Sequence, residues 1–207
     1  MAKDRPIEVE LVPATPDRER EVRLLRELLA AARAAQAANG AVSVLRDELS
    51  EMANRRAVGK SQNKPYGHYN SLEDLVLAEG DHQVGSKKWF PRCGWKMGPP
   101  QQCYRNSYRI VAKNPLRYMY CEGWVRCGRD FVVEHAWVRD QDGLVIDPTL
   151  SDGLEYLGLC FRFDVVRATI AREGRYGLCG SGDLLRLLLT DPEFRSKNLS
   201  ESDPLTF

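Results

Sequence analysis

Cys103, His135 and Asp147 are the residues whose types and settings in this sequence best suit chemistry. Cys103 follows Gln102 at the start of a predicted helix, where free backbone N–H groups and the helix dipole favour a thiolate. A carboxylate bonded to one imidazole nitrogen fixes the tautomer and stabilises the imidazolium, and the other nitrogen can then face a nucleophile. Such a thiolate–imidazolium pair attacks an amide or thioester carbonyl, and the histidine then protonates the leaving group. Backbone N–H groups at the helix start, including that of Cys103, are candidates to hold the oxyanion.

Each of these residues also has an ordinary structural explanation. A cysteine near a helix start is usually a small apolar side chain, a histidine beside Trp137 on a strand is usually structural, and an aspartate before Pro148 commonly forms a turn. The order Cys, His, Asp, with a suitable predicted element under each residue, favours the catalytic interpretation. The other two histidines, His68 and His82, fall in predicted loops before the cysteine and lack such a setting.

His135 and Asp147 lie in two consecutive strand-like runs, residues 131–138 and 144–150. Side chains alternate along a strand, so His135 shares a face with Trp137. The carboxylate of Asp147 can meet the imidazole only if it lies on that same face.

The turn between the two runs decides the face of Asp147. A two-residue turn at 142–143 would place it opposite Val138, on the wrong face, whereas a three-residue loop at 141–143 would place it opposite Trp137. Glycine at the third position suits the longer loop, because that residue has a positive φ. A diagonal neighbour is then about 7–8 Å away between Cα atoms, close enough for the two side chains to meet. The sequence therefore permits the hydrogen bond.

The elements around these residues predict an α+β fold. A short helix is expected at "SLEDLVLAEG", capped by Ser71, and a second at "QQCYRNSYRIVAKNP", bounded by prolines. Three strand-like runs, "RYMYCEGWV", "FVVEHAWV" and "LVIDPTL", follow, then a fourth, "EYLGLCFRF", and two helices, "DVVRATIAREG" and "SGDLLRLLLTDPEF". Runs of strands followed by runs of helices indicate an α+β domain containing an antiparallel meander.

Three parts of the chain are distinguished by composition. Residues 1–58 are expected to form an N-terminal helical arm, residues 59–195 the α+β domain, and residues 196–207 a loose tail. The arm is expected to pack as a helical hairpin on the domain or on a second copy, because no heptad pattern persists for about 3–4 repeats. The alternative is an arm that binds a partner protein.

The composition excludes several classes of protein. A hydrophobic content of 43% and a charged content of 29% support a folded core, and a net charge of +1 gives no reason to expect nucleic acid or a membrane surface as partner. No signal peptide and no apolar run of about 18 residues are present, so we expect a cytoplasmic protein whose six cysteines remain thiols. The cysteine spacing contains no CxxC pair, so no metal is expected.

The segments "EHAWV" and "DGLVIDPTL" resemble the second half of the transglutaminase-like core of the papain-like superfamily. The wider pattern, over residues 70–163, also resembles a group of bacterial and phage proteins with no known substrate. The first resemblance implies Cys103 as nucleophile, His135 as base and acid and Asp147 as the residue that orients the imidazole. It implies no cofactor, and a peptide or protein as substrate.

The sequence departs from the papain pattern at the oxyanion position. Papain-like enzymes place a glutamine a few residues before the cysteine in a Gly-rich turn, whereas here Gln101 and Gln102 directly precede it. The candidates for substrate or oxyanion contact are Gln102, Trp95, Glu122 and Trp137. Glu134 and Glu122 are expected to line the cleft or to form surface ion pairs.

Three functions compete at this point. The first is a cysteine-dependent protease, amidase, deamidase or acyl transferase that works through a thioester, with the loop at 87–100 as a wall of the cleft or a cover over the core. The second is a non-catalytic binding module that retains the papain-like fold and docks through its N-terminal helix. The third is nucleic-acid binding through the basic residues at 55–64 and 87–96, which the near-zero net charge disfavours.

Overall fold

Four of the five strands belong to the regions predicted as strands, and they form one antiparallel sheet with a fifth strand that was not predicted. The computed structural model describes residues 43–57, 69–85, 96–128, 131–180 and 182–199. Its strands are β1 (Asp81–Val84), β2 (Tyr118–Cys127), β3 (Phe131–Asp140), β4 (Val145–Ile146) and β5 (Gly153–Phe161). Its helices are α2 (Val44–Ala57), α3 (Leu72–Glu79), α4 (Cys103–Lys113), α5 (Phe163–Glu173), α6 (Gly182–Thr190) and α7 (Pro192–Asn198).

The sheet has the order β1-β5-β2-β3-β4. The hairpins β2-β3 and β3-β4 follow the predicted meander, but β5 pairs with β2 instead of continuing beside β4. β1 was predicted as loop, because its sequence DHQV has one apolar residue and low strand propensity. It forms a strand by pairing with β5, with His82 opposite Leu157. The α+β prediction is thus confirmed, with a different strand order.

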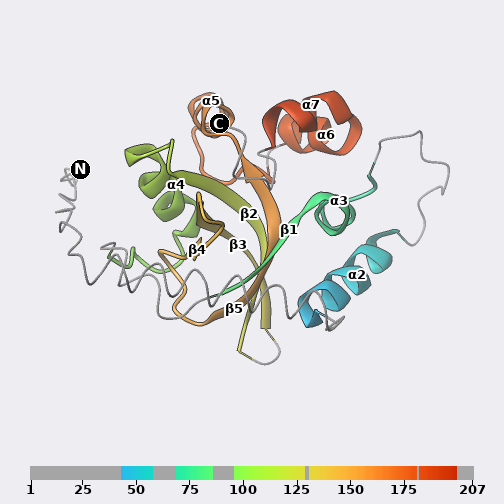
Figure 1. The fold of residues 1–207 in the computed structure, drawn as a ribbon. Coiled ribbons are helices and arrows are strands. Elements are labelled where there is room, and N and C mark those ends of the chain that lie inside the picture. Colours follow the sequence, from blue (N-terminus) through green and yellow to red (C-terminus); the bar gives the residue numbers. More distant parts are fainter. Residues whose placement is uncertain (1–42, 58–68, 86–95, 129–130, 181, 200–207) are drawn as a thin grey trace.

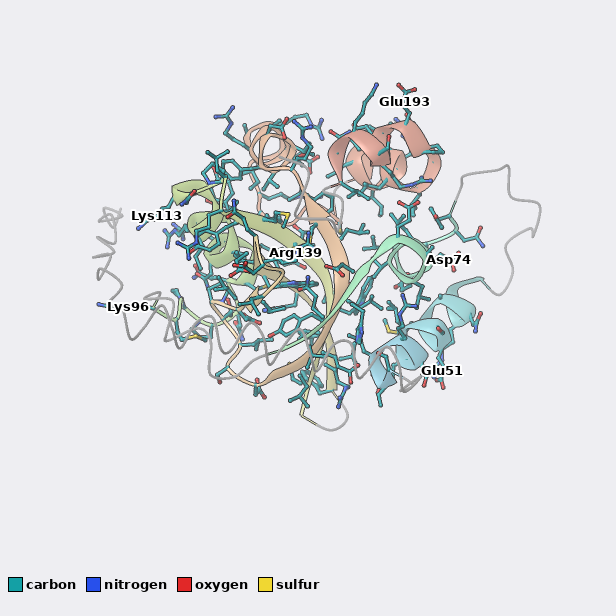
Figure 2. The ribbon with its side chains drawn as sticks, viewed as in Figure 1. Glu51, Asp74, Lys96, Lys113, Arg139 and Glu193 are labelled. Carbon is teal, nitrogen blue, oxygen red and sulfur yellow. A yellow bond between two sulfur atoms is a disulfide. The ribbon has the colours of Figure 1, made fainter. Side chains whose placement is uncertain are left out.

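The sheet is strongly curled. β5 and β2 separate β1 from β3, yet the side chains of Asp81 and Arg139 form an ion pair across them. Trp137 Nε1 also donates to Gln83 Oε1 at 3.4 Å. Figure 2 shows Arg139 within the molecule, whereas the labelled Lys113 and Glu193 project from its rim. The inner face of the sheet therefore closes on itself.

Two apolar clusters occupy the two faces of this sheet. The larger cluster lies between the outer face of the sheet and the helices. Its helical members include Leu75 of α3, Ile110 of α4 and Val166 of α5. In Figure 1, α2 and α3 lie next to each other and contact β5, α4 lies beside β2 and β3, and α6 and α7 lie together. The smaller cluster fills the inner face and is built from β2, β3, β4 and β5, with Trp137 and Tyr156 at its centre. The helix α4 is thus held against the strand that carries His135.

Part of the predicted N-terminal arm packs into this core. Leu45 and Leu49 of α2 are fully buried, and each such side chain contributes about 1.5–3 kcal/mol. The Ser43 hydroxyl, just before α2, donates to Glu155 Oε2 on β5 at 2.8 Å. The first helix predicted for the arm lies outside the described residues. At the other end, α7 continues to Asn198, beyond the boundary predicted at residue 195.

The expectation that all six cysteines remain thiols is wrong for two of them. Cys121 and Cys160 form a disulfide, with their Cα atoms 4.1 Å apart. The reason is strand register: the two residues lie directly opposite each other on β2 and β5, so their side chains share the inner face of the sheet. Cys103, Cys127 and Cys179 are free thiols.

None of the helices in the described ranges combines the length and the apolar character that crossing a bilayer requires.

Candidate active site

The turn between β3 and β4 is the three-residue loop that places Asp147 on the face of His135. Asp140 N donates to Leu144 O at 3.0 Å, which leaves residues 141–143 as the loop, and Gly143 has φ 73°. The Asp140 carboxylate supports the turn by accepting from Leu144 N at 2.8 Å. The predicted loop is therefore confirmed, and the two-residue alternative is excluded.

The side chains of His135 and Asp147 meet at the end of this hairpin. His135 Nε2 lies 2.8 Å from Asp147 Oδ2, and both residues are buried. The other carboxylate oxygen, Oδ1, accepts from the backbone N–H groups of Thr149 and Leu150, each at 2.8 Å. The Tyr156 hydroxyl donates to Oδ2 at 2.9 Å. Three donors besides the histidine therefore fix the carboxylate, and the carboxylate fixes the imidazole.

Cys103 lies near the imidazole of His135. It is the first residue of α4, it is partly exposed, and it lies close enough to His135 to raise the pKa of the imidazole. Because Asp147 holds Nε2, the nitrogen left for the thiol is Nδ1. Burial lowers the pKa of His135, but the hydrogen bonds and charges of Asp147 and Cys103 outweigh burial and raise that pKa to about 9. The site therefore favours an imidazolium beside the sulfur.

The short β4 makes this approach of α4 possible. β4 pairs with β3 only at Val138 and Arg139, so the stretch of β3 around His135 has β2 as its only strand partner among the described residues. Ser107 Oγ of α4 donates to the carbonyl oxygen of Ala136 at 3.0 Å. This bond attaches the helix to β3 directly beside the histidine, one turn after the cysteine.

Asn106 connects the two loops that flank the site. Its Nδ2 donates to Pro99 O at 2.8 Å, before the cysteine, and to Thr149 Oγ1 at 3.0 Å, after the aspartate. Gly98 N donates to Pro148 O at 2.7 Å and joins the same two loops. Sequence reasoning missed Asn106, although a polar residue on the buried face of an amphipathic helix is a signal that could have found it. It also missed Tyr156, whose contact depends on the non-local position of β5.

The backbone before Cys103 has an uncommon conformation. Gln101 has φ 59°, in the left-handed region, and Gln102 is the N-cap residue of α4 without a side-chain capping bond. Left-handed conformations cost a non-glycine residue about 1 kcal/mol or more, and such residues often occur at functional sites. The side chain of Gln102 is partly exposed and uncommitted to the cap, so it stays a candidate for oxyanion contact. Trp95 lies outside the described residues.

Glu122 is buried under the site and holds a loop. Its carboxylate accepts from Leu178 N at 2.7 Å, from Cys179 N at 2.8 Å and from the Tyr120 hydroxyl at 2.7 Å. Burial raises the pKa of this carboxyl, although these hydrogen bonds oppose the shift. With 1% of its surface exposed, Glu122 is too buried for direct contact with a substrate.

Trp137 is equally buried, at 1% exposure. Its ring packs against that of Tyr156 with centroids 5.2 Å apart, and its indole N–H points to Gln83. Its position supports the inner face behind His135 and speaks against direct substrate contact. Glu134, the neighbour of the histidine, is exposed on the opposite face of β3.

Comparisons with known proteins give no assignment. No family model matches the chain, and no match was found among curated proteins or among solved structures. In the described segments, no group of three or more His, Cys, Asp and Glu side chains is placed to hold a metal ion. The feature of the described residues that suits chemistry is the grouping of a thiol, an imidazole and a carboxylate at Cys103, His135 and Asp147.

Proposed function

We propose that this protein is a cysteine-dependent enzyme of amide or acyl chemistry with a papain-like, transglutaminase-like core. One observation carries the proposal: the imidazole of His135 is bonded to Asp147, and that carboxylate and the nearby Cys103 thiol together raise the pKa of His135 to about 9. The same order of groups, from nucleophile through base to orienting residue, defines catalytic triads on unrelated folds. A peptide or protein is the proposed substrate.

The proposed reaction starts from a thiolate–imidazolium pair. The sulfur of Cys103 attacks the carbonyl carbon of an amide or thioester, and the C–S bond forms as the carbonyl oxygen takes the negative charge. Backbone N–H groups at the start of α4 are the nearest candidates to stabilise that oxygen, with Gln102 as a side-chain candidate. His135 then gives its proton to the leaving amine or thiol, and the C–N or C–S bond to the leaving group breaks. Water or an amine resolves the thioester, which gives hydrolysis or acyl transfer.

The arrangement of elements supports the papain-like part of the proposal. A helix with the cysteine at its first position packs against an antiparallel sheet, and two successive strands carry the histidine and the segment with the aspartate. The buried position of Asp147 excludes bulk water from the His–Asp bond, which strengthens that bond.

Alkylation of Cys103 by iodoacetamide tests the proposal. We expect Cys103 in the wild type to react well below the ordinary thiol pKa of about 8.5, with its rate followed by peptide mass spectrometry across pH 5–9. The variant His135→Ala should move the reactivity of the same thiol toward the ordinary range. Because each thiol is compared with itself, differences in exposure among the cysteines do not enter. An unchanged pH profile in His135→Ala would refute the enzyme proposal and would favour the alternative, a non-catalytic binding module.

A further inference from the structure

A pocket of about 490 Å³ is lined by the chain neighbours of two candidate catalytic residues. Tyr104, which follows Cys103 on α4, and Glu134, which precedes His135 on β3, both line it. The remaining walls come from the loop at 175–180 and from α6, with Tyr176 and Leu189 among the lining residues. The chain neighbours of both the proposed nucleophile and the proposed base thus form one recess.

The uncommitted charge of this pocket is negative. Glu134 is exposed and its carboxylate has no hydrogen-bond or ion-pair partner among the described residues. Arg175, the lining cation, is already engaged: its Nη2 donates to Gly180 O at 2.7 Å and its Nε lies 3.4 Å from Glu173 Oε2. Arg172 Nη2 binds the other oxygen of the same carboxylate at 3.0 Å. A ligand entering the pocket therefore meets a free carboxylate and a cation that already has an acidic neighbour.

Two aromatic rings also favour a positively charged ligand in this pocket. Tyr104 and Tyr176 both line the pocket, and the face of a tyrosine ring attracts an ammonium or guanidinium group. Burial and the nearby acid groups raise the pKa of Tyr104, so its hydroxyl stays neutral. The walls therefore combine an apolar surface, which accepts the stem of a side chain, with a negative end group.

The pocket is held in shape by buried contacts. Glu122 binds the backbone N–H groups of Leu178 and Cys179, which anchors the loop at 175–180 to β2. Gly177 has φ 101°, a conformation that only glycine adopts easily, and it lies against the Tyr104 ring. A recess fixed in this way binds a ligand without first ordering its own wall.

We propose that this pocket binds the cationic side chain of the substrate, an ammonium or guanidinium group on the residue next to the reacting carbonyl. The inference rests on the proposed function, because it treats the pocket as the specificity site of the Cys103 thiol. The cation lies between the tyrosine rings and pairs with Glu134, while its apolar stem contacts Leu189. Acyl donors with lysine or arginine at that position are thus the preferred class.

The test uses two thiol-directed peptidyl acyloxymethyl ketones that carry lysine or norleucine beside the reactive group. Norleucine matches the lysine stem and lacks the ammonium, so the ratio of the two alkylation rates of Cys103 isolates the charge. We expect lysine to react about fivefold faster in the wild type, as suits an exposed ion pair with aromatic neighbours. The ratio should fall to about one in Glu134→Gln and below one in Glu134→Lys. Glu51→Gln removes the same charge from α2, which contributes no residue to the pocket, and should keep the wild-type ratio.

Iodoacetamide, which is small and neutral, separates this inference from the proposed function. If iodoacetamide shows a reactive Cys103 but the lysine and norleucine probes react equally, the cation pocket is refuted and the enzyme proposal stands. If iodoacetamide shows an ordinary thiol, the enzyme proposal fails, and calorimetric binding of N-acetyl-lysine methylamide decides the pocket. Binding that Glu134→Gln weakens supports a cation site, whereas equal or undetectable binding in both proteins overturns it.

Discussion

His135 Nε2 and Asp147 Oδ2 lie 2.8 Å apart in the interior, and the chain achieves this with one three-residue loop. A loop shorter by one residue would turn every side chain after it to the other face of the sheet. The backbone N–H groups of Thr149 and Leu150 then lock the carboxylate from the far side. The orientation of the imidazole is thus a property of the hairpin and of the segment that follows it.

Replacing Asp147 with asparagine should lower the reactivity of Cys103. The amide keeps the shape of the carboxylate but removes the charge that stabilises the imidazolium, so alkylation of Cys103 near pH 6.5 should be about tenfold slower. The measurement is the iodoacetamide rate of Cys103 against pH. Tyr156→Phe removes one donor to Asp147 and keeps the charge, so it should slow labelling much less. Equal losses in both variants would contradict an electrostatic role for Asp147.

The raised pKa of His135 predicts a pH-dependent stability. The folded protein holds this proton more tightly than the unfolded chain, with a pKa of about 9 against about 6.5. The contribution is therefore fully present below pH about 6.5 and is lost as the pH rises through about 9, at about 1.4 kcal/mol per pH unit between them. Urea unfolding of wild type and His135→Gln from pH 6 to 9.5 measures the difference. Parallel curves for the two proteins would show that the histidine gains no proton on folding.

Asn106→Ala should loosen the site without changing its charge. The substitution removes the donor to Pro99 O and Thr149 Oγ1, and each of these part-buried hydrogen bonds contributes about 0.5–1.5 kcal/mol. We expect lower stability and slower alkylation of Cys103 at every pH, with the midpoint of the pH profile unchanged. Ser50→Ala in α2 removes a hydroxyl that bonds to its own helix and is the control for loss of a side-chain hydrogen bond away from the site. A shifted midpoint would mean that Asn106 affects the charges as well as the geometry.

Local patterns in the sequence were sufficient for the parts that bring the triad together. Proline boundaries and an apolar face predicted α4, which begins at Cys103, and Gly143 predicted the longer hairpin loop. Each of these features is decided within a few residues of chain, where propensity and turn chemistry dominate. The contact of His135 with Asp147 could therefore be anticipated before any long-range pairing was known.

Three features that were not predicted depend on where β5 pairs. β5 lies between β1 and β2, which gives the polar segment at 81–84 a partner and makes it a strand. The same pairing brings the Tyr156 hydroxyl to Asp147 and sets Cys160 opposite Cys121. Nothing local in the β5 sequence specifies that neighbour, because an alternating apolar run pairs equally well with several strands. Non-local register thus decided the second support of the carboxylate and the disulfide.

The disulfide between Cys121 and Cys160 should contribute strongly to stability. The two cysteines are 39 residues apart, and closing a loop of that length stabilises the fold by about 4 kcal/mol in the chain-entropy model. Reduction should therefore lower the free energy of unfolding by about 2–4 kcal/mol, measured by urea denaturation with and without a phosphine reductant. The double variant Cys121→Ala, Cys160→Ala should be destabilised to a similar extent and should not respond to the reductant. Because both sulfurs lie on the inner face of the sheet, with Trp137 and Tyr156 in the same cluster, the bond also braces the wall behind His135. A wild type whose unfolding curve is unchanged by the reductant would show that the bridge adds nothing to the packing of that wall.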